Sequence, residues 1–112
     1  MEEKYKLELL FPAQRELEEI ARMHMELVGP LSARKITNRI YSAMEKLKTF
    51  PELGVLCKDK QLAMAGYRML ICGNHLCIYR QVGHTLFVYH IVDGRTDYPR
   101  LLSGLEKVKH IE

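Results

Sequence analysis

Cysteine is scarce in this sequence, and long apolar runs are missing. The three cysteines, Cys57, Cys72 and Cys77, include no CxxC pair, so we expect reduced thiols rather than a disulfide framework. No zinc site is predicted, because no second pair of ligands stands near them. No apolar stretch approaches the roughly 18 residues of a membrane span. The acidic N-terminus, with only a short apolar patch, does not match a secretory signal. The sequence therefore predicts a cytoplasmic protein without a membrane partner.

The composition that remains is that of an ordinary globular protein. Hydrophobic residues make up 47% and charged residues 28% of the chain. Its 112 residues predict one domain, 1–112. Residues 1–56 carry nine Lys/Arg and nine Asp/Glu, whereas residues 57–112 carry eight and five, so the net charge of +3 arises in the second half. This excess favours an anionic partner for that half.

The first half of the chain reads as a strand followed by two helices. Residues 5–10 alternate apolar and polar, as a half-buried strand does. Apolar residues at helical spacing predict a first helix between Pro12 and Gly29. A second helix is predicted with Ser32 as its N-cap, and it ends at Phe50. Because the connection is so short, the two helices should form an antiparallel hairpin.

The second half predicts strands. Residues 52–66 read as irregular, and short turns near Gly73 and Gly83 separate three apolar runs that should form an antiparallel meander. These runs are 67–72, 75–81 and 85–92. Residues 101–112 have the spacing of a short tail helix. The expected fold class is α+β, with an N-terminal strand, an antiparallel helical hairpin and a three-stranded antiparallel meander, and with the helices packed on one sheet face.

Alternation along the meander predicts which side chains share a face. One face should carry Arg68, Leu70, Cys72, His75, Cys77, Tyr79, Gln81, Leu86, Val88, His90 and Val92. The other should carry Tyr67, Met69, Ile71, Leu76, Ile78, Arg80, Phe87, Tyr89 and Ile91. The second face is more apolar, so we expect the helices to cover it. Arg68, Tyr79 and His90 would then converge on an open face, with Arg95 and Tyr98 at its rim.

The order of these elements and three motifs resemble a known family. The motifs are Gly66-Tyr67-Arg68, residues 82–85 (VGHT) and residues 93–98 (DGRTDY), and the resemblance covers about residues 4–103. The chain is similar to the RelE/ParE superfamily, the toxins of bacterial type II toxin–antitoxin modules, often called plasmid-stabilisation proteins. The resemblance implies a partner antitoxin that wraps the toxin in a hetero-oligomer. It also implies one of two activities, since RelE-like members cleave mRNA in the ribosomal A site and ParE-like members poison DNA gyrase.

The resemblance also implies roles for particular residues. Arg68 matches a phosphate-binding arginine, and Arg95 matches an arginine that stabilises charge in the transition state. Tyr98 stands near the position of a residue that handles protons. Lys58 and Lys60 are each one position away from the RelE lysines that contact RNA.

Chemistry adds further candidates. His90 could act as base or acid near neutral pH, Tyr79 could stack on a base or supply a proton, and Arg80 follows Tyr79 in a somewhat ParE-like strand. Each residue also has a structural alternative: Arg68 could pair with a carboxylate, Tyr79 could be packing, and His90 could be a half-buried strand residue. The predicted catalytic set is Arg68, Arg95, His90 and Tyr98, and the predicted RNA-binding set is Lys58, Lys60, Tyr79 and Arg80.

The function predicted first is a ribosome-dependent mRNA endoribonuclease that needs no metal or cofactor. A gyrase poison that acts by binding is the alternative, and a degenerate member that only binds its antitoxin is the third.

Overall fold

A computed structural model describes residues 5–95 and 99–100 of the chain. Tyr98 and the predicted tail helix at 101–112 lie outside these residues. In chain order the elements are β1 (Lys6–Leu9), α1 (Phe11–Leu27), α2 (Pro30–Glu45), the short 3-10 helix η1 (Lys46–Lys48), β2 (Val55–Leu56), α3 (Lys60–Met64), β3 (Arg68–Cys72), β4 (His75–Val82) and β5 (Thr85–Asp93).

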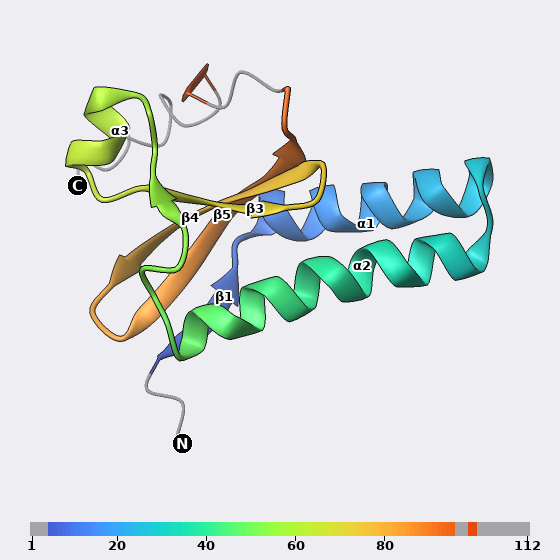
Figure 1. The fold of residues 1–112 in the computed structure, drawn as a ribbon, viewed down its shortest axis with the longest axis horizontal. Coiled ribbons are helices and arrows are strands. Elements are labelled where there is room, and N and C mark those ends of the chain that lie inside the picture. Colours follow the sequence, from blue (N-terminus) through green and yellow to red (C-terminus); the bar gives the residue numbers. More distant parts are fainter. Residues whose placement is uncertain (1–4, 96–98, 101–112) are drawn as a thin grey trace.

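The strands form one five-stranded sheet in the order β1-β5-β4-β3-β2. The neighbouring pairs β5-β4, β4-β3 and β3-β2 are antiparallel, whereas β1 runs parallel to β5. Figure 1 shows α1 and α2 lying side by side as a hairpin against one side of this sheet. The predicted α+β fold is therefore confirmed, with β1 and the short β2 as the two edges of the sheet.

The two helices begin at prolines. Both α1 and α2 have proline in the first turn, where a missing N–H is tolerated. The N-cap of α2 is Gly29, with φ of 132°, so the prediction of Ser32 as N-cap was wrong. The helix starts earlier than predicted because glycine adopts this backbone conformation without a steric penalty and Pro30 then enters the helix directly.

The main core lies between the helical hairpin and the sheet. Its buried members are Ala13 and Leu17 of α1, Ile40 and Met44 of α2, Leu47, and the strand residues Leu70, Cys72, Cys77, Tyr79, Leu86, Val88 and Ile91. All of these strand residues lie on the face that carries Arg68, including Ile91, which pairs with Cys77 although it was predicted for the other face. The prediction that the helices cover the opposite face was therefore wrong.

A second core explains this error. Residues 52–66 were predicted to be irregular, yet they contain β2 and α3, and Asp59 caps α3 by accepting a hydrogen bond from the Leu62 N–H at 3.0 Å. The segment around α3 covers the other sheet face. The buried residues there are Cys57, Leu62, Tyr67, Met69, Ile78 and Tyr89. Because both faces of the sheet are apolar and buried, alternation alone does not indicate which one the hairpin contacts.

A β-bulge interrupts the alternation in β5. Tyr79 is paired with Val88 and Ile78 with His90, so Tyr89 is an extra residue in β5. Leu86 and Val88 lie on the Arg68 face as predicted, but His90 is opposite Ile78 and shifted out of that alternation. The predicted convergence of His90 with Arg68 and Tyr79 on one open face was therefore wrong.

Candidate functional site

Arg68 and Tyr79 do lie together, at the loop that precedes β2. The Tyr79 hydroxyl donates a hydrogen bond to the Pro51 carbonyl at 2.7 Å and accepts one from the Gly54 N–H at 2.9 Å. The Arg68 guanidinium donates to the Gly54 carbonyl at 2.8 Å. A Cβ on Gly54 would lie 2.7 Å from the Met69 carbonyl oxygen, so the loop backbone is pressed against the sheet. These two side chains hold the loop in place.

Tyr79 is inaccessible to an outside molecule, since none of its surface is exposed. Burial raises the pKa of its phenol, an effect opposed by the Gly54 hydrogen bond and by the nearby charge of Arg68. The hydroxyl is therefore protonated near neutral pH, as its bond to Pro51 requires. In this position Tyr79 neither stacks on an RNA base nor delivers a proton to one.

Arg80 lies in the second core, with 9% of its surface exposed. Its guanidinium carbon is 4.6 Å from the Tyr67 ring centroid and 5.6 Å from that of Tyr89. It donates hydrogen bonds to the Tyr89 hydroxyl at 3.0 Å and to the Ala65 carbonyl at 3.4 Å. Contacts with two tyrosine rings stabilise a cation that has left water. Arg80 thus joins α3 to the sheet rather than facing a solvent-exposed RNA site.

His90 is paired with a residue that the sequence did not indicate. Its Nδ1 is 2.9 Å from a carboxylate oxygen of Glu16, in α1, and the same carboxylate accepts a hydrogen bond from the Ile91 N–H at 2.8 Å. β1 is paired with β5 only as far as Val88, so Glu16 takes the place of a strand partner beyond that point. The Glu16 carboxylate therefore orients the His90 ring. Arg68 and Tyr79 belong to a separate cluster, at the loop before β2.

Of the predicted residues that the structure describes, Arg95, Lys58 and Lys60 are exposed. The Arg95 side chain is 93% exposed, and its Nε donates a hydrogen bond to Asp93 at 3.1 Å. The Arg95 backbone N–H also bonds to this carboxylate, and the two bonds from Arg95 lower the pKa of Asp93. Arg95 lines a cavity of about 460 Å³ beside Ile71 and the turn after it. Lys58 and Lys60 are exposed on the segment around α3.

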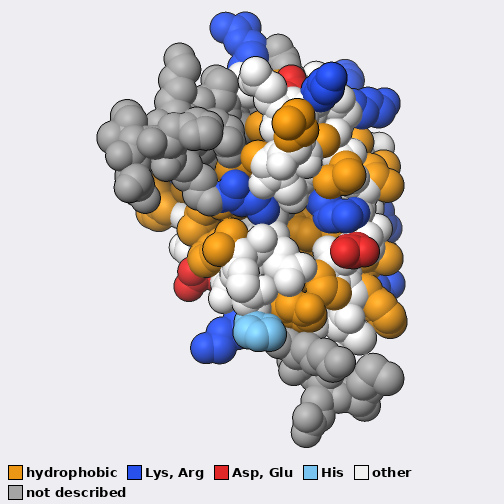
Figure 2. Space-filling view, turned by 90° about the vertical axis from the view of Figure 1, so that its left-hand side faces the viewer, with side chains coloured by type: hydrophobic (Ala, Val, Ile, Leu, Met, Phe, Trp, Pro, Cys, Tyr) orange, Lys and Arg blue, Asp and Glu red, His pale blue; other side chains and the backbone are white. Residues whose placement is uncertain are grey.

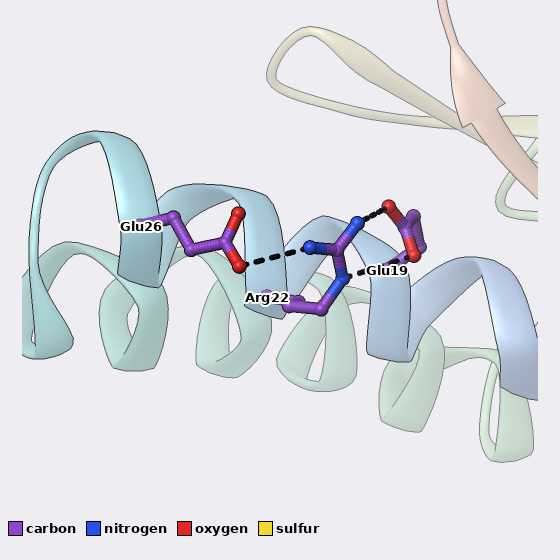
Figure 3. A network of polar contacts seen from close by, with 3 residues as sticks. All are labelled: Glu19, Arg22 and Glu26. Carbon is purple, nitrogen blue, oxygen red and sulfur yellow. Dashed lines mark hydrogen bonds and ion pairs between the residues drawn. The ribbon is translucent and has the colours of Figure 1, made fainter.

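The charged side chains form no single basic surface on the face seen in Figure 2. There the described Lys and Arg side chains lie in several separate places among apolar ones. On α1, Arg22 is held by Glu19 and by Glu26, with 2.9 Å between Arg22 and Glu26 (Figure 3). Exposed pairs of this kind at helical spacing add little stability. They do neutralise the positive charge of Arg22.

Two further properties concern ligands and membranes. Within residues 5–95 and 99–100, no group of three or more His, Cys, Asp or Glu side chains is placed to hold a metal ion. In the same residues no helix has the length and apolarity needed to span a membrane. The three cysteines, all within the described residues, are buried and not joined in disulfides, and the sulfurs of Cys72 and Cys77 are 3.6 Å apart.

Sequence reasoning missed two features of this region. Glu16 gives no signal, because a glutamate beside several other charged residues of an amphipathic helix reads as solvated. The loop before β2 could have been suspected from Gly54, since an isolated glycine close to a strand often marks a close approach of backbones. Finding its partners Arg68 and Tyr79 required the sheet register.

Solved structures share this fold, among them two from toxin–antitoxin systems. One is described as the chromosomal ParDE toxin–antitoxin system from P. aeruginosa, with a TM-score of 0.69 and 19% identity over 82% of this chain and 98% of that one. The other is the RelBE2 toxin–antitoxin complex from Mycobacterium tuberculosis, with a TM-score of 0.60 and 16% identity over 80% of this chain and 98% of that one. No curated protein matches in sequence. The chain therefore has the RelE/ParE-like fold.

A family model identifies the chain more closely. The model of the ParE toxin of the type II toxin–antitoxin system parDE matches residues 7–98. The chain belongs to this family, within the RelE/ParE superfamily that the motifs predicted. It is the toxin of a type II toxin–antitoxin system.

Proposed function

We propose that this toxin acts in the cytoplasm by binding DNA gyrase, without cleaving RNA, and that its cognate antitoxin neutralises it in a hetero-oligomer. The observation that carries this proposal is that four of the eight predicted catalytic and RNA-binding side chains are bound by other parts of the protein. Arg68 and Tyr79 hold a loop, Arg80 lies in a core and His90 is paired with Glu16. RNA cleavage needs a base, an acid and positive charge at one phosphate, and these four residues do not surround one open site.

The exposed Arg95 is the residue that we propose contacts the target. A guanidinium forms forked hydrogen bonds with carboxylates on another protein as readily as with phosphates. Its side chain is held to Asp93 by one bond and is otherwise exposed, beside a cavity whose lining includes the apolar Ile71 and Leu76. A rim contact of this kind suits a binding toxin, because it requires no second catalytic group nearby.

A ribosome-dependent mRNA endoribonuclease is the second candidate. It is favoured by the accessibility of Arg95, Lys58 and Lys60, which carry the positive charges that an RNA backbone would contact. The third candidate is a degenerate member that binds only its antitoxin. It agrees with the same contacts as the first candidate and differs from it in having no target to inhibit.

The deciding experiment adds the purified toxin to DNA gyrase and, separately, to mRNA on translating ribosomes. We expect supercoiling to fall while the mRNA stays intact. Cleaved mRNA with unaffected supercoiling would establish the second candidate. An effect on neither, together with harmless expression in cells that lack the antitoxin, would establish the third.

Arg95→Ala tests the contact residue within the same assays. We expect this variant to lose gyrase inhibition and growth arrest with unchanged folding, since an exposed residue contributes within about 0.5 kcal/mol. Arg34→Ala, at an exposed position of α2, is the matched control and should remain toxic. A folded Arg95→Ala variant that still arrests growth would remove Arg95 from the site.

A further inference from the structure

The outer edge of β3 is only partly covered. β2 is paired with β3 through just two residue pairs, Val55 with Met69 and Leu56 with Arg68. β3 continues to Cys72, and its inner edge is paired with β4 along its whole length. Among the described residues, no strand lies against the outer edge beyond Met69. The last part of β3 is therefore an open sheet edge.

The backbone of Ile71 faces this open edge. The Tyr67 carbonyl accepts a hydrogen bond from the Cys57 N–H at 3.1 Å, which shows that Tyr67 directs its backbone groups away from β4. In an antiparallel strand this direction alternates residue by residue. Met69 and Ile71 therefore share the direction of Tyr67. Met69 is opposite Val55, whereas Ile71 has an N–H and a C=O that point where no described strand lies.

The edge is open because the loop before β2 is fixed. Antiparallel pairing of Val55 with Met69 would place Leu53 opposite Ile71 if β2 were longer. Instead, Arg68 and Tyr79 bind the Gly54 backbone, and the Leu53 N–H bonds back to the Phe50 carbonyl at 3.0 Å. The chain thus turns away from β3 at Gly54. These hydrogen bonds hold this arrangement, so the opening is a built feature of the fold.

The surroundings of the edge are apolar with positive charge beside them. A cavity of about 350 Å³ lies there, lined by Ala43, Lys46, Leu53, Gly54, Val55, Met69, Leu70 and Ile71. The Ile71 side chain is 65% exposed and that of Val55 56%. Lys46 is the charged member of the lining, and the Arg39 guanidinium lies near Gly73, at the turn that ends β3. Natural sheet edges usually carry a charge, a proline or a bulge against unwanted pairing, and Leu70–Ile71 has none.

We propose that an extended segment of the antitoxin pairs with β3 at Ile71 and places apolar side chains in the cavity. Carboxylates of this segment would face Lys46 and Arg39, so the segment should be rich in acidic and apolar residues. Main-chain hydrogen bonds would supply affinity, and the cavity would supply specificity, as in other cases of strand addition. The inference rests on the antitoxin partnership proposed above and is independent of whether gyrase or mRNA is the target.

Amide hydrogen exchange tests this at residue resolution. The toxin, labelled with ¹⁵N, is measured alone and with the antitoxin expressed from the reading frame beside the toxin gene. In the free toxin the Ile71 amide should exchange fast, while those of Leu70 and Cys72, directed at β4, exchange slowly. In the complex, exchange at Ile71 should slow on the order of 100-fold or more.

A pair of variants at Ile71 separates backbone from side-chain contributions. Ile71→Pro removes the outward N–H but leaves pairing with β4, since proline is tolerated at a free edge. We expect it to weaken antitoxin binding about tenfold or more. Ile71→Thr keeps the N–H and should bind within a few-fold of the natural protein. Lys46→Glu, which leaves β3 unaltered, should also weaken binding and covers the case in which the proline variant does not fold.

The remaining outcomes overturn the proposal in distinguishable ways. A complex that forms while the Ile71 amide still exchanges fast would refute strand addition and leave the toxin–antitoxin partnership intact. A slow Ile71 amide in the isolated toxin would mean that another copy, or another part of this chain, covers the edge. Failure of the two purified proteins to associate would refute both the edge proposal and the antitoxin partnership.

Discussion

Replacing Tyr79 by phenylalanine should destabilise the protein without a direct effect on its chemistry. The change removes a single oxygen that accepts from the Gly54 N–H at 2.9 Å and donates to the Pro51 carbonyl at 2.7 Å. The ring itself, fully buried in the main core, keeps its packing. The two backbone groups would remain enclosed by the loop without their partner.

The magnitude follows from these two bonds. Leaving a buried donor or acceptor unpaired costs about 1–3 kcal/mol for each group. The Pro51 side is only partly buried, so water can satisfy part of its loss. We therefore expect Tyr79→Phe to lower the free energy of unfolding by about 2–3 kcal/mol, which corresponds to a melting temperature lower by roughly 10–20 °C for a domain of this size.

Urea denaturation and thermal melting followed by circular dichroism measure this loss. Tyr41→Phe is the matched control, because Tyr41 is an exposed tyrosine of α2 with no hydrogen bond to lose among those described, and its stability should be unchanged. Below the melting temperature, folded Tyr79→Phe should keep its inhibitory activity. A variant of unchanged stability that had lost activity would refute the structural role and restore Tyr79 to the functional site.

Three other perturbations test the contacts described above. Gly54→Ala should cost about 2–4 kcal/mol of stability in urea denaturation, because its Cβ would lie 2.7 Å from the Met69 carbonyl oxygen. Glu16→Ala should cost about 2 kcal/mol in the same assay, since it leaves the Ile91 N–H without its acceptor. Burial lowers the pKa of His75 in the folded protein. As the pH falls, the unfolded chain therefore protonates His75 before the folded chain does. Stability should then fall as pH drops below about 6.5, and His75→Asn should remove that part of the fall in urea midpoint.

Each of these changes has a matched control in the chain. Gly94→Ala places a Cβ no closer than 3.4 Å to another atom and should cost much less than Gly54→Ala. Glu18→Ala and His84→Asn alter exposed residues of the same types and should leave stability and its pH dependence unchanged. Equal losses from Gly54→Ala and Gly94→Ala, or from Glu16→Ala and Glu18→Ala, would contradict the packing and hydrogen bonding described here. A His75→Asn variant with the natural pH profile would show that His75 titrates alike in the folded and unfolded chain.

The sequence by itself determined the elements with strong local signals. Helical spacing and proline predicted α1 and α2, and alternation with glycine turns predicted β3, β4 and β5, because such patterns depend on residues close in the chain. The same patterns, with the motif at residues 93–98, led to the family. Local pattern also singled out Arg95 as a candidate, a role that the assays above would test.

Only the tertiary structure decided which residues meet. Both sheet faces are apolar, so the pattern alone allows the helical hairpin on either one. The structure shows the hairpin on the Arg68 face and the segment around α3 on the opposite face. One extra residue, Tyr89, moved His90 away from Arg68 and beside Glu16. The partners of Arg68 and Tyr79 lie in a loop far from them in sequence. Register and long-range hydrogen bonds leave no local trace, because they depend on how distant segments pack together.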